Sequence, residues 1–87
     1  MKTFHLTISS PDGNVFDGEI YKLDLRGVEG ELAIMAGHVP FVTSVKSAPC
    51  VVWLDDDTPK KAYSKGGLLT VDKDKTTYIS GTFKFDE

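Results

Sequence analysis

Glycine and proline recur along the whole chain and leave little room for helices. The eight glycines and four prolines leave one interval longer than ten residues that is free of both types, at 68–80. Helices average about 11–12 residues and avoid glycine and proline in their interiors. Valine, isoleucine and threonine supply twenty residues, and apolar and polar residues alternate with a period of two in many places. The sequence therefore predicts an all-β protein.

Turn residues divide the chain into about eight short strands. In the first, Phe4, Leu6 and Ile8 share one face, as in a half-buried strand, and the turn Ser10–Asn14 follows. Eight short strands separated by turns are typical of a sandwich or a small barrel. Residues 1–80 form one domain, and we expect the tail 81–87 to fray or to add an edge strand. The expected strands lie near 3–9, 21–26, 31–35, 41–46, 50–54, 60–64, 68–71 and 76–80.

The small size of the chain makes a binding partner the default expectation. A domain of 87 residues buries only about 60–65% of the surface of its unfolded chain, so its core is marginal. Cys50 is the only cysteine, which excludes an internal disulfide and any zinc site built from several cysteines. We expect Cys50 to be a buried, inert thiol, because its neighbours are apolar.

Charge and hydropathy exclude several classes of protein. A net charge of -3 and a pI near 5.2 disfavour binding to nucleic acid. The N-terminus lacks the apolar run of a signal peptide, and no stretch approaches the ~18 apolar residues of a membrane span. We expect a soluble protein made inside the cell, which can still sit on a membrane complex.

Candidate groups for catalysis or metal binding are few. The only histidines are His5 and His38, and a histidine metal site needs two or three converging ligands. The acidic segments at 55–57 and 72–74 lack the pattern of a calcium loop, and the loop 27–30 lacks that of a phosphate loop. No Gly-x-Ser-x-Gly motif occurs. We expect no catalytic residue, metal or cofactor, although a spatial site around His38 stays open as an alternative.

Polar and large apolar side chains concentrate in one stretch, from Glu29 to Phe41. Mixed clusters of this kind on loops suit the recognition of another protein better than catalysis. For Met35 and Phe41, a simple place in the core is an equally good interpretation.

Several segments resemble the N-terminal domain of the ATP synthase epsilon subunit. They are FHLTISSPDG (4–13), VFDGE (15–19), EGELAIMAGHVPFVTSVK (29–46) and SKGGLLTVDKDKTTYIS (64–80). The resemblance covers about residues 3–80. It implies a β-sandwich of two five-stranded sheets, about ten short strands in all.

The resemblance also implies a function. Family members of this kind are non-catalytic parts of the rotor of a proton-translocating ATP synthase, where they bind the gamma subunit and the c-ring and couple proton flow to ATP synthesis. It places the protein at the cytoplasmic face of a bacterial plasma membrane, held there through the complex. The family's C-terminal pair of helices has no counterpart in this sequence, so we expect neither ATP binding nor inhibition of ATP hydrolysis.

Matching by position assigns five residues to two interfaces. Glu29 and Glu31 match the end that meets the c-ring, whereas Ser10, His38 and Thr43 match the face toward the gamma subunit. Ala33 and Ala36 replace a glycine and a proline of the family pattern. Two alternatives from other classes stay open: a small β-barrel that binds ligands or oligonucleotides, and a small hydrolase.

Overall fold

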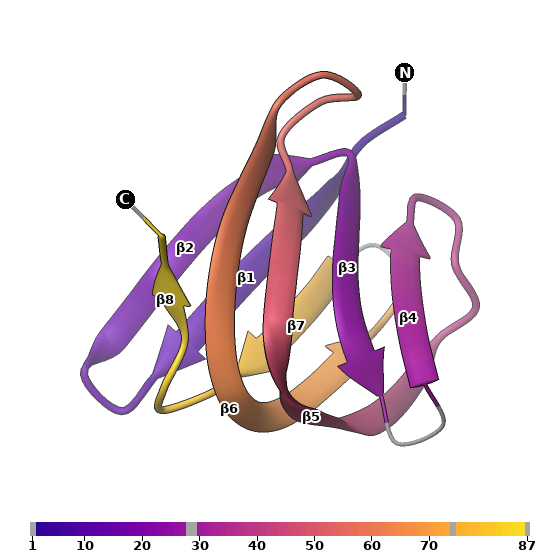
Figure 1. Ribbon diagram of the computed structural model, residues 1–87. Helices are drawn as coiled ribbons and strands as arrows, with labels where there is room; N and C mark the ends of the chain where they lie inside the picture. Colours follow the sequence, from indigo (N-terminus) through magenta and orange to yellow (C-terminus); the bar gives the residue numbers. More distant parts are fainter. Residues whose placement is uncertain (1, 28–29, 74, 87) are drawn as a thin grey trace.

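A computed structural model describes residues 2–27, 30–73 and 75–86 of the chain as a two-layer β-sandwich (Figure 1). All its regular elements are strands, which confirms the all-β prediction. In the described ranges, no helix is long and apolar enough to cross a bilayer. The strands are β1 (Phe4–Ser10), β2 (Gly13–Ile20), β3 (Lys22–Gly27), β4 (Gly30–Met35), β5 (Phe41–Trp53), β6 (Pro59–Val71), β7 (Lys75–Ile79) and β8 (Lys84–Phe85).

One hydrogen-bonded path connects all the strands, in the order β2-β1-β7-β6-β5-β3-β4, with β8 attached to β6. The path is open, because β2 and β4 form its two ends, so the small β-barrel is not the fold. β1 and β7 run parallel, whereas the other neighbours are antiparallel. The sandwich is thus one long sheet folded over on itself.

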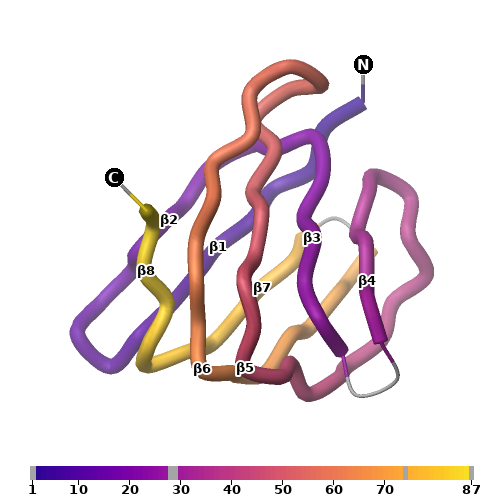
Figure 2. Tube along the Cα trace, in the orientation of Figure 1, coloured from indigo at the N-terminus to yellow at the C-terminus, as the bar shows by residue number. Residues whose placement is uncertain are grey.

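The two longest strands, β5 and β6, carry the chain from one layer to the other. They pair from Phe41↔Val71 to Trp53↔Pro59, and both curve sharply midway (Figures 1 and 2). The early half of β5 and the late half of β6 join β7, β1 and β2 in what we call the β1 layer. Their other halves join β3, β4 and β8 in the β3 layer.

Two adjacent glycines lie where β6 bends. Gly66 has a φ of 118°, and a Cβ atom there would lie 2.7 Å from the carbonyl oxygen of Val45. A Cβ atom at Gly67 would lie 2.2 Å from the carbonyl oxygen of Ile79. The close approach of three strands at this corner therefore requires glycine.

The strand count of ten implied by the resemblance is wrong, because the described residues form eight strands. The eight expected from the turns agree in number but not in identity. The segments 41–46 and 50–54 are one continuous strand, as are 60–64 and 68–71, because the bends do not interrupt the ladder. β2 and β8 were not among the strands expected from the turns.

The core lies between the layers. Leu6 and Ile8 are fully buried, as their alternation predicts. Cys50 is buried as well. Phe83, from the expected tail, is 5% exposed and belongs to the same core. The tail thus packs on the sandwich and adds β8 at Ala62 and Tyr63.

Candidate interaction surfaces

The outer face of the β1 layer carries an apolar patch of three side chains. Val42, Leu68 and Ile79 are 63%, 42% and 50% exposed. Leu68 of β6 is directly opposite Ile79 of β7. Val42 of β5 is opposite Thr70, which lies two residues after Leu68 on β6. Val42 and Leu68 are therefore diagonal neighbours on one face. A contiguous exposed patch of large apolar side chains is typical of an interaction site.

The same layer bears a charged cluster at its β2 edge. The ring of His5 lies between two carboxylates of β2: Nε2 faces Asp17, and Nδ1 lies 3.2 Å from Oε2 of Glu19. The hydroxyl of Thr7 donates to Asp17 at 3.2 Å. Only the doubly protonated imidazolium can donate to both acids at once. This cluster strengthens the pairing of β1 with the edge strand β2.

Each ring nitrogen of His5 faces one carboxylate, so the cluster has the geometry of two ion pairs whenever the imidazole is protonated. The hydrogen bond from His5 is the main cause that holds the pKa of Asp17 below its ordinary value. In the described part of the chain, no group of three or more His, Cys, Asp or Glu side chains is arranged to hold a metal ion.

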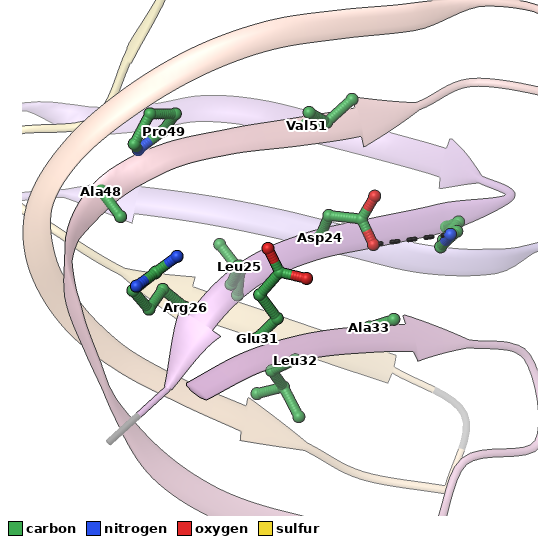
Figure 3. A pocket seen from close by; sticks show the side chains of 10 residues that line it. Asp24, Leu25, Arg26, Glu31, Leu32, Ala33, Ala48, Pro49 and Val51 are labelled. Carbon is green, nitrogen blue, oxygen red and sulfur yellow. Dashed lines mark ion pairs between the residues drawn. The ribbon is translucent and has the colours of Figure 1, made fainter. Parts of the chain in front are cut away.

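The outer face of the β3 layer is hollowed where β5 departs from β3. The register between these strands shifts between the pairs Asp24↔Val51 and Gly27↔Val45, an irregularity that interrupts the ladder. The resulting β3–β5 hollow has a volume of about 610 Å³. Arg26 and Glu31, which face each other across β3 and β4, both extend into this space (Figure 3). Its apolar lining consists of Leu25, Leu32, Ala33, Ala48, Pro49 and Val51.

An ion pair and an indole define the far end of this hollow. Nζ of Lys22 lies 3.6 Å from Oδ1 of Asp24, and Nε1 of Trp53 donates to Oδ2 of Asp24 at 3.0 Å. Asp24 is therefore satisfied within the protein.

A second hollow, of about 550 Å³, opens between the start of β4 and the start of β5. Glu31 and Thr43 both line it, together with Leu32 and Phe41. The structure thus brings together two residues that the sequence assigns to different interfaces. Glu31 also lines the β3–β5 hollow, so its carboxylate borders both spaces.

The other predicted interface residues that the structure describes, Ser10 and His38, do not line this second hollow. Ser10 is the last residue of β1, and its Oγ donates to the carbonyl oxygen of Gly13 at 3.1 Å. The ring of His38 packs against that of Phe41, with centroids 5.0 Å apart. Two strands, β7 and β6, separate the strand of Ser10 from that of Thr43 in the sheet. Glu29 lies outside the described residues.

The structure decides whether Met35 and Phe41 belong to the core or to the surface. Phe41 is half-buried and packs against the core, whereas Met35 is 41% exposed. The core interpretation is therefore right for Phe41 and wrong for Met35.

Sequence reasoning missed the apolar patch as a candidate site. Its only sequence signal is a large apolar residue on the otherwise polar side of a strand: Val42 alternates out of phase with Phe41, Thr43 and Val45. Leu68 and Ile79 lie on two other strands. That the three meet depends on the register of β5, β6 and β7.

Known proteins resemble this chain in sequence and in fold. Residues 3–84 match the family described as "ATP synthase, Delta/Epsilon chain, beta-sandwich domain". The "ATP synthase epsilon chain, sodium ion specific" of Acetobacterium woodii is 34% identical over 86 residues, which cover 99% of this chain and 65% of that one.

Two solved structures share the fold at lower identity. One chain of the Euglena gracilis mitochondrial ATP synthase (OSCP/F1/c-ring) superposes with a TM-score of 0.88 at 18% identity, over 95% of this chain and 53% of that chain. One chain of the Tetrahymena thermophila mitochondrial ATP synthase (central stalk/c-ring) gives 0.79 at 10% identity, over 95% and 66%. This chain thus spans about two thirds or less of the length of these relatives. By its sequence and its fold, it belongs to the family of ATP synthase delta/epsilon chain β-sandwich domains.

Proposed function

We propose that this domain is a non-catalytic rotor part of an ion-translocating ATP synthase, and that it binds the gamma subunit and the c-ring. Its work is mechanical: it transmits rotation between the membrane ring and the catalytic head through two interfaces. Membership of the family supports this proposal. The domain would be peripheral to the membrane, on the side of the catalytic head.

The observation that carries the gamma interface is the apolar patch of Val42, Leu68 and Ile79. A small domain of this family gains stability by covering such a patch, because removing apolar surface from water contributes about 25 cal/mol per Å². Thr70 and Thr77 lie next to the patch in the same ladders, and their hydroxyl groups can form hydrogen bonds with a partner. Such a surface, apolar at its centre and polar at its rim, suits a lasting protein interface.

The end of the molecule that carries Glu31 supports the c-ring interface. Glu31 is exposed at the start of β4 and borders two hollows, so its carboxylate can accept hydrogen bonds from a partner. An anionic group there suits polar or cationic loops of a membrane ring. Ser10, His38 and Thr43 remain proposed contacts of the gamma subunit.

In this proposal the c-ring, and not this domain, selects the transported ion. The resemblance implies protons, whereas the Acetobacterium woodii relative is named as sodium ion specific. A domain that acts through its outer surfaces serves either ion equally.

Co-elution with a purified gamma subunit in size-exclusion chromatography tests the proposal. We expect a complex at micromolar concentration and its loss in Leu68→Asp, which places a charge in the apolar patch. The matched control is Val15→Asp, since Val15 is an exposed apolar residue on the edge strand β2, outside the patch. Absence of a complex with the parent chain would refute the gamma interface.

A further inference from the structure

An exposed tyrosine is held in place on the outer face of the β3 layer. Tyr63 is 44% exposed, although large aromatic side chains usually seek burial. Its hydroxyl lies 2.8 Å from Oγ of Ser47 on β5. This bond restricts the ring before any partner binds, so little side-chain entropy remains to be lost on association.

Cationic side chains surround this tyrosine. Lys61 and Lys65 lie two residues before and after it on β6, and Lys84 of β8 is directly opposite it. All three are exposed. The chain as a whole carries a net charge of -3, so this concentration of lysines is an asymmetry of the molecule.

Few carboxylates neutralise these cations. Within 2–27, 30–73 and 75–86, the ion pairs are those of His5 and of Lys22, and none involves the three lysines or Arg26. Among the described residues of this face, the acids are Asp24, which Lys22 already pairs, Glu31 and Asp86. The described side chains of this face therefore carry an excess of positive charge.

The β3–β5 hollow lies directly beside the tyrosine. Pro49 is opposite Tyr63 in the β5–β6 ladder and also lines the hollow. Buried Leu25 and Ala48 form part of its floor, while Arg26 extends into it from β3 (Figure 3). A volume of about 610 Å³ can accommodate a large apolar side chain of a partner.

We propose that this face, which comprises Tyr63, the lysines 61, 65 and 84, Arg26 and the β3–β5 hollow, binds an acidic segment of another protein. Carboxylates of the segment pair with the lysines and Arg26, and an apolar side chain of the segment enters the hollow beside Tyr63. Aromatic and arginine side chains are the residues that most often dominate binding at such interfaces. The carrying observation is the juxtaposition of a restrained tyrosine, unneutralised cations and an apolar hollow.

An anionic lipid surface fits this face less well than a protein segment does. The face is concave at the hollow, whereas a membrane surface meets a flat or convex basic patch. Glu31 and Asp86 would also be repelled by lipid headgroups, while a segment of defined sequence can place its own polar groups opposite them.

This site is separate from the proposed gamma interface. The apolar patch is on the outer face of the β1 layer, and the tyrosine is on the outer face of the β3 layer. Figure 1 shows these two layers packed face to face. Both faces can therefore be covered at the same time. The inference stands on its own observations and holds even if gamma does not bind.

Backbone amide NMR of the whole chain, titrated with a short acetylated peptide of alternating Glu and Leu, tests the proposal. We expect shift changes near 24–26, 48–51, 61–65 and 84, and weaker binding as salt is added. The same peptide with Lys in place of Glu should not bind there. No shift change with the acidic peptide, or changes confined to the apolar patch, would overturn the proposal.

Substitutions test which side chains bind the peptide, and lipid vesicles test whether the partner is a membrane instead. We expect Tyr63→Ala, and Lys65→Glu combined with Lys84→Glu, each to weaken peptide binding about tenfold. Tyr63→Phe, which keeps the ring, should weaken it less, and Lys75→Glu on the other layer is the charge control. Binding to vesicles that contain phosphatidylglycerol, without binding to the peptide, would replace the protein partner by a membrane. Retained co-elution with gamma in the double variant separates this site from the proposed function.

Discussion

The hydroxyl oxygen of Tyr78 lies 2.7 Å from Oγ of Ser64 inside the sandwich, and both side chains are fully buried. Ser64 comes from the early half of β6 and Tyr78 from β7, so the bond links the two layers. Sγ of Cys50 lies 3.9 Å from the same Oγ. Burial raises the pKa of Tyr78, which keeps the phenol neutral and able to donate. One polar contact thus connects three strands across the core.

Ser64→Ala should therefore destabilise the domain more than its size suggests. The substitution removes the 2.7 Å partner of the buried phenol, and the loss of a buried hydrogen-bond partner costs about 1–3 kcal/mol. Urea unfolding measures this loss. Adding Tyr78→Phe removes the phenol hydroxyl as well. The double variant should therefore lose less free energy of unfolding than the sum of the losses of the two single variants.

The control for this prediction is Ser44→Ala on β5. Ser44 is exposed, so its loss should change the free energy of unfolding by less than about 0.5 kcal/mol. Equal effects of Ser64→Ala and Ser44→Ala would show that the Tyr78 bond contributes nothing to stability.

Gly67→Ala should be severely destabilising, because the methyl group would lie 2.2 Å from the carbonyl oxygen of Ile79 and 2.9 Å from Cε1 of Tyr78. We expect a loss of about 1–3 kcal/mol or more from overpacking. At Gly18 the nearest atom to an added methyl is Cζ of Phe16, at 3.6 Å, an ordinary contact. Gly18→Ala should therefore be tolerated, and thermal unfolding of the two variants compares them directly.

The sequence predicts the local elements of this fold better than their connections. Alternation identifies the buried face of β1, where Leu6 and Ile8 lie, because a period of two decides the face without any knowledge of neighbours. The sequence pattern wrongly divides β5 and β6 into two strands each, because Pro49 and the pair Gly66–Gly67 look like turn residues that end a strand. In the structure the ladder continues through both positions.

The candidate surfaces show the same limit. Glu31 and His38 can be chosen from sequence because motifs carry them. The apolar patch and the basic face cannot, because Leu68 meets Ile79 and Tyr63 meets Lys84 only through the register of separate strands. The sequence around each of these residues contains no motif that marks it as part of an interaction surface.

The pKa of Asp17 provides a test of the charged cluster at the β2 edge. The hydrogen bond from His5 is the largest cause that lowers this pKa below 3.8, followed among the lowering causes by the bond from Thr7, with Lys75 the smallest. Because the folded pKa is the lower one, the stabilisation is present above 3.8 and is lost as the pH falls through the folded value. Carboxyl NMR titration should show a higher Asp17 pKa in His5→Gln, and smaller rises in Thr7→Val and Lys75→Ala. The reverse order would contradict the assigned causes.

Phe83 should be as important for stability as a residue in the middle of the domain. It is 5% exposed, and its ring makes edge contacts with Tyr78 and Phe85, at centroid distances of 6.0 and 5.0 Å. Phe83→Ala should cost about 3–5 kcal/mol, as other deletions of a buried aromatic ring do. Lys84→Ala, an exposed neighbour, is the control in the same denaturant titration. A near-neutral Phe83→Ala would mean that the tail is not part of the folded unit.

Glu31→Lys should weaken coupling in the assembled enzyme more than it weakens folding. Glu31 is exposed and makes no ion pair within the described ranges, so reversing its charge leaves the core intact. Opposite a polar or cationic loop, however, the new lysine repels its partner. We therefore expect reduced ATP-driven ion pumping by reconstituted vesicles, with an unchanged free energy of unfolding for the isolated chain. The matched control is Asp56→Lys, since Asp56 is in the turn between β5 and β6. Figure 1 shows this turn at the opposite end of the sandwich from the start of β4. Unchanged pumping in Glu31→Lys, with normal assembly, would remove Glu31 from the c-ring interface.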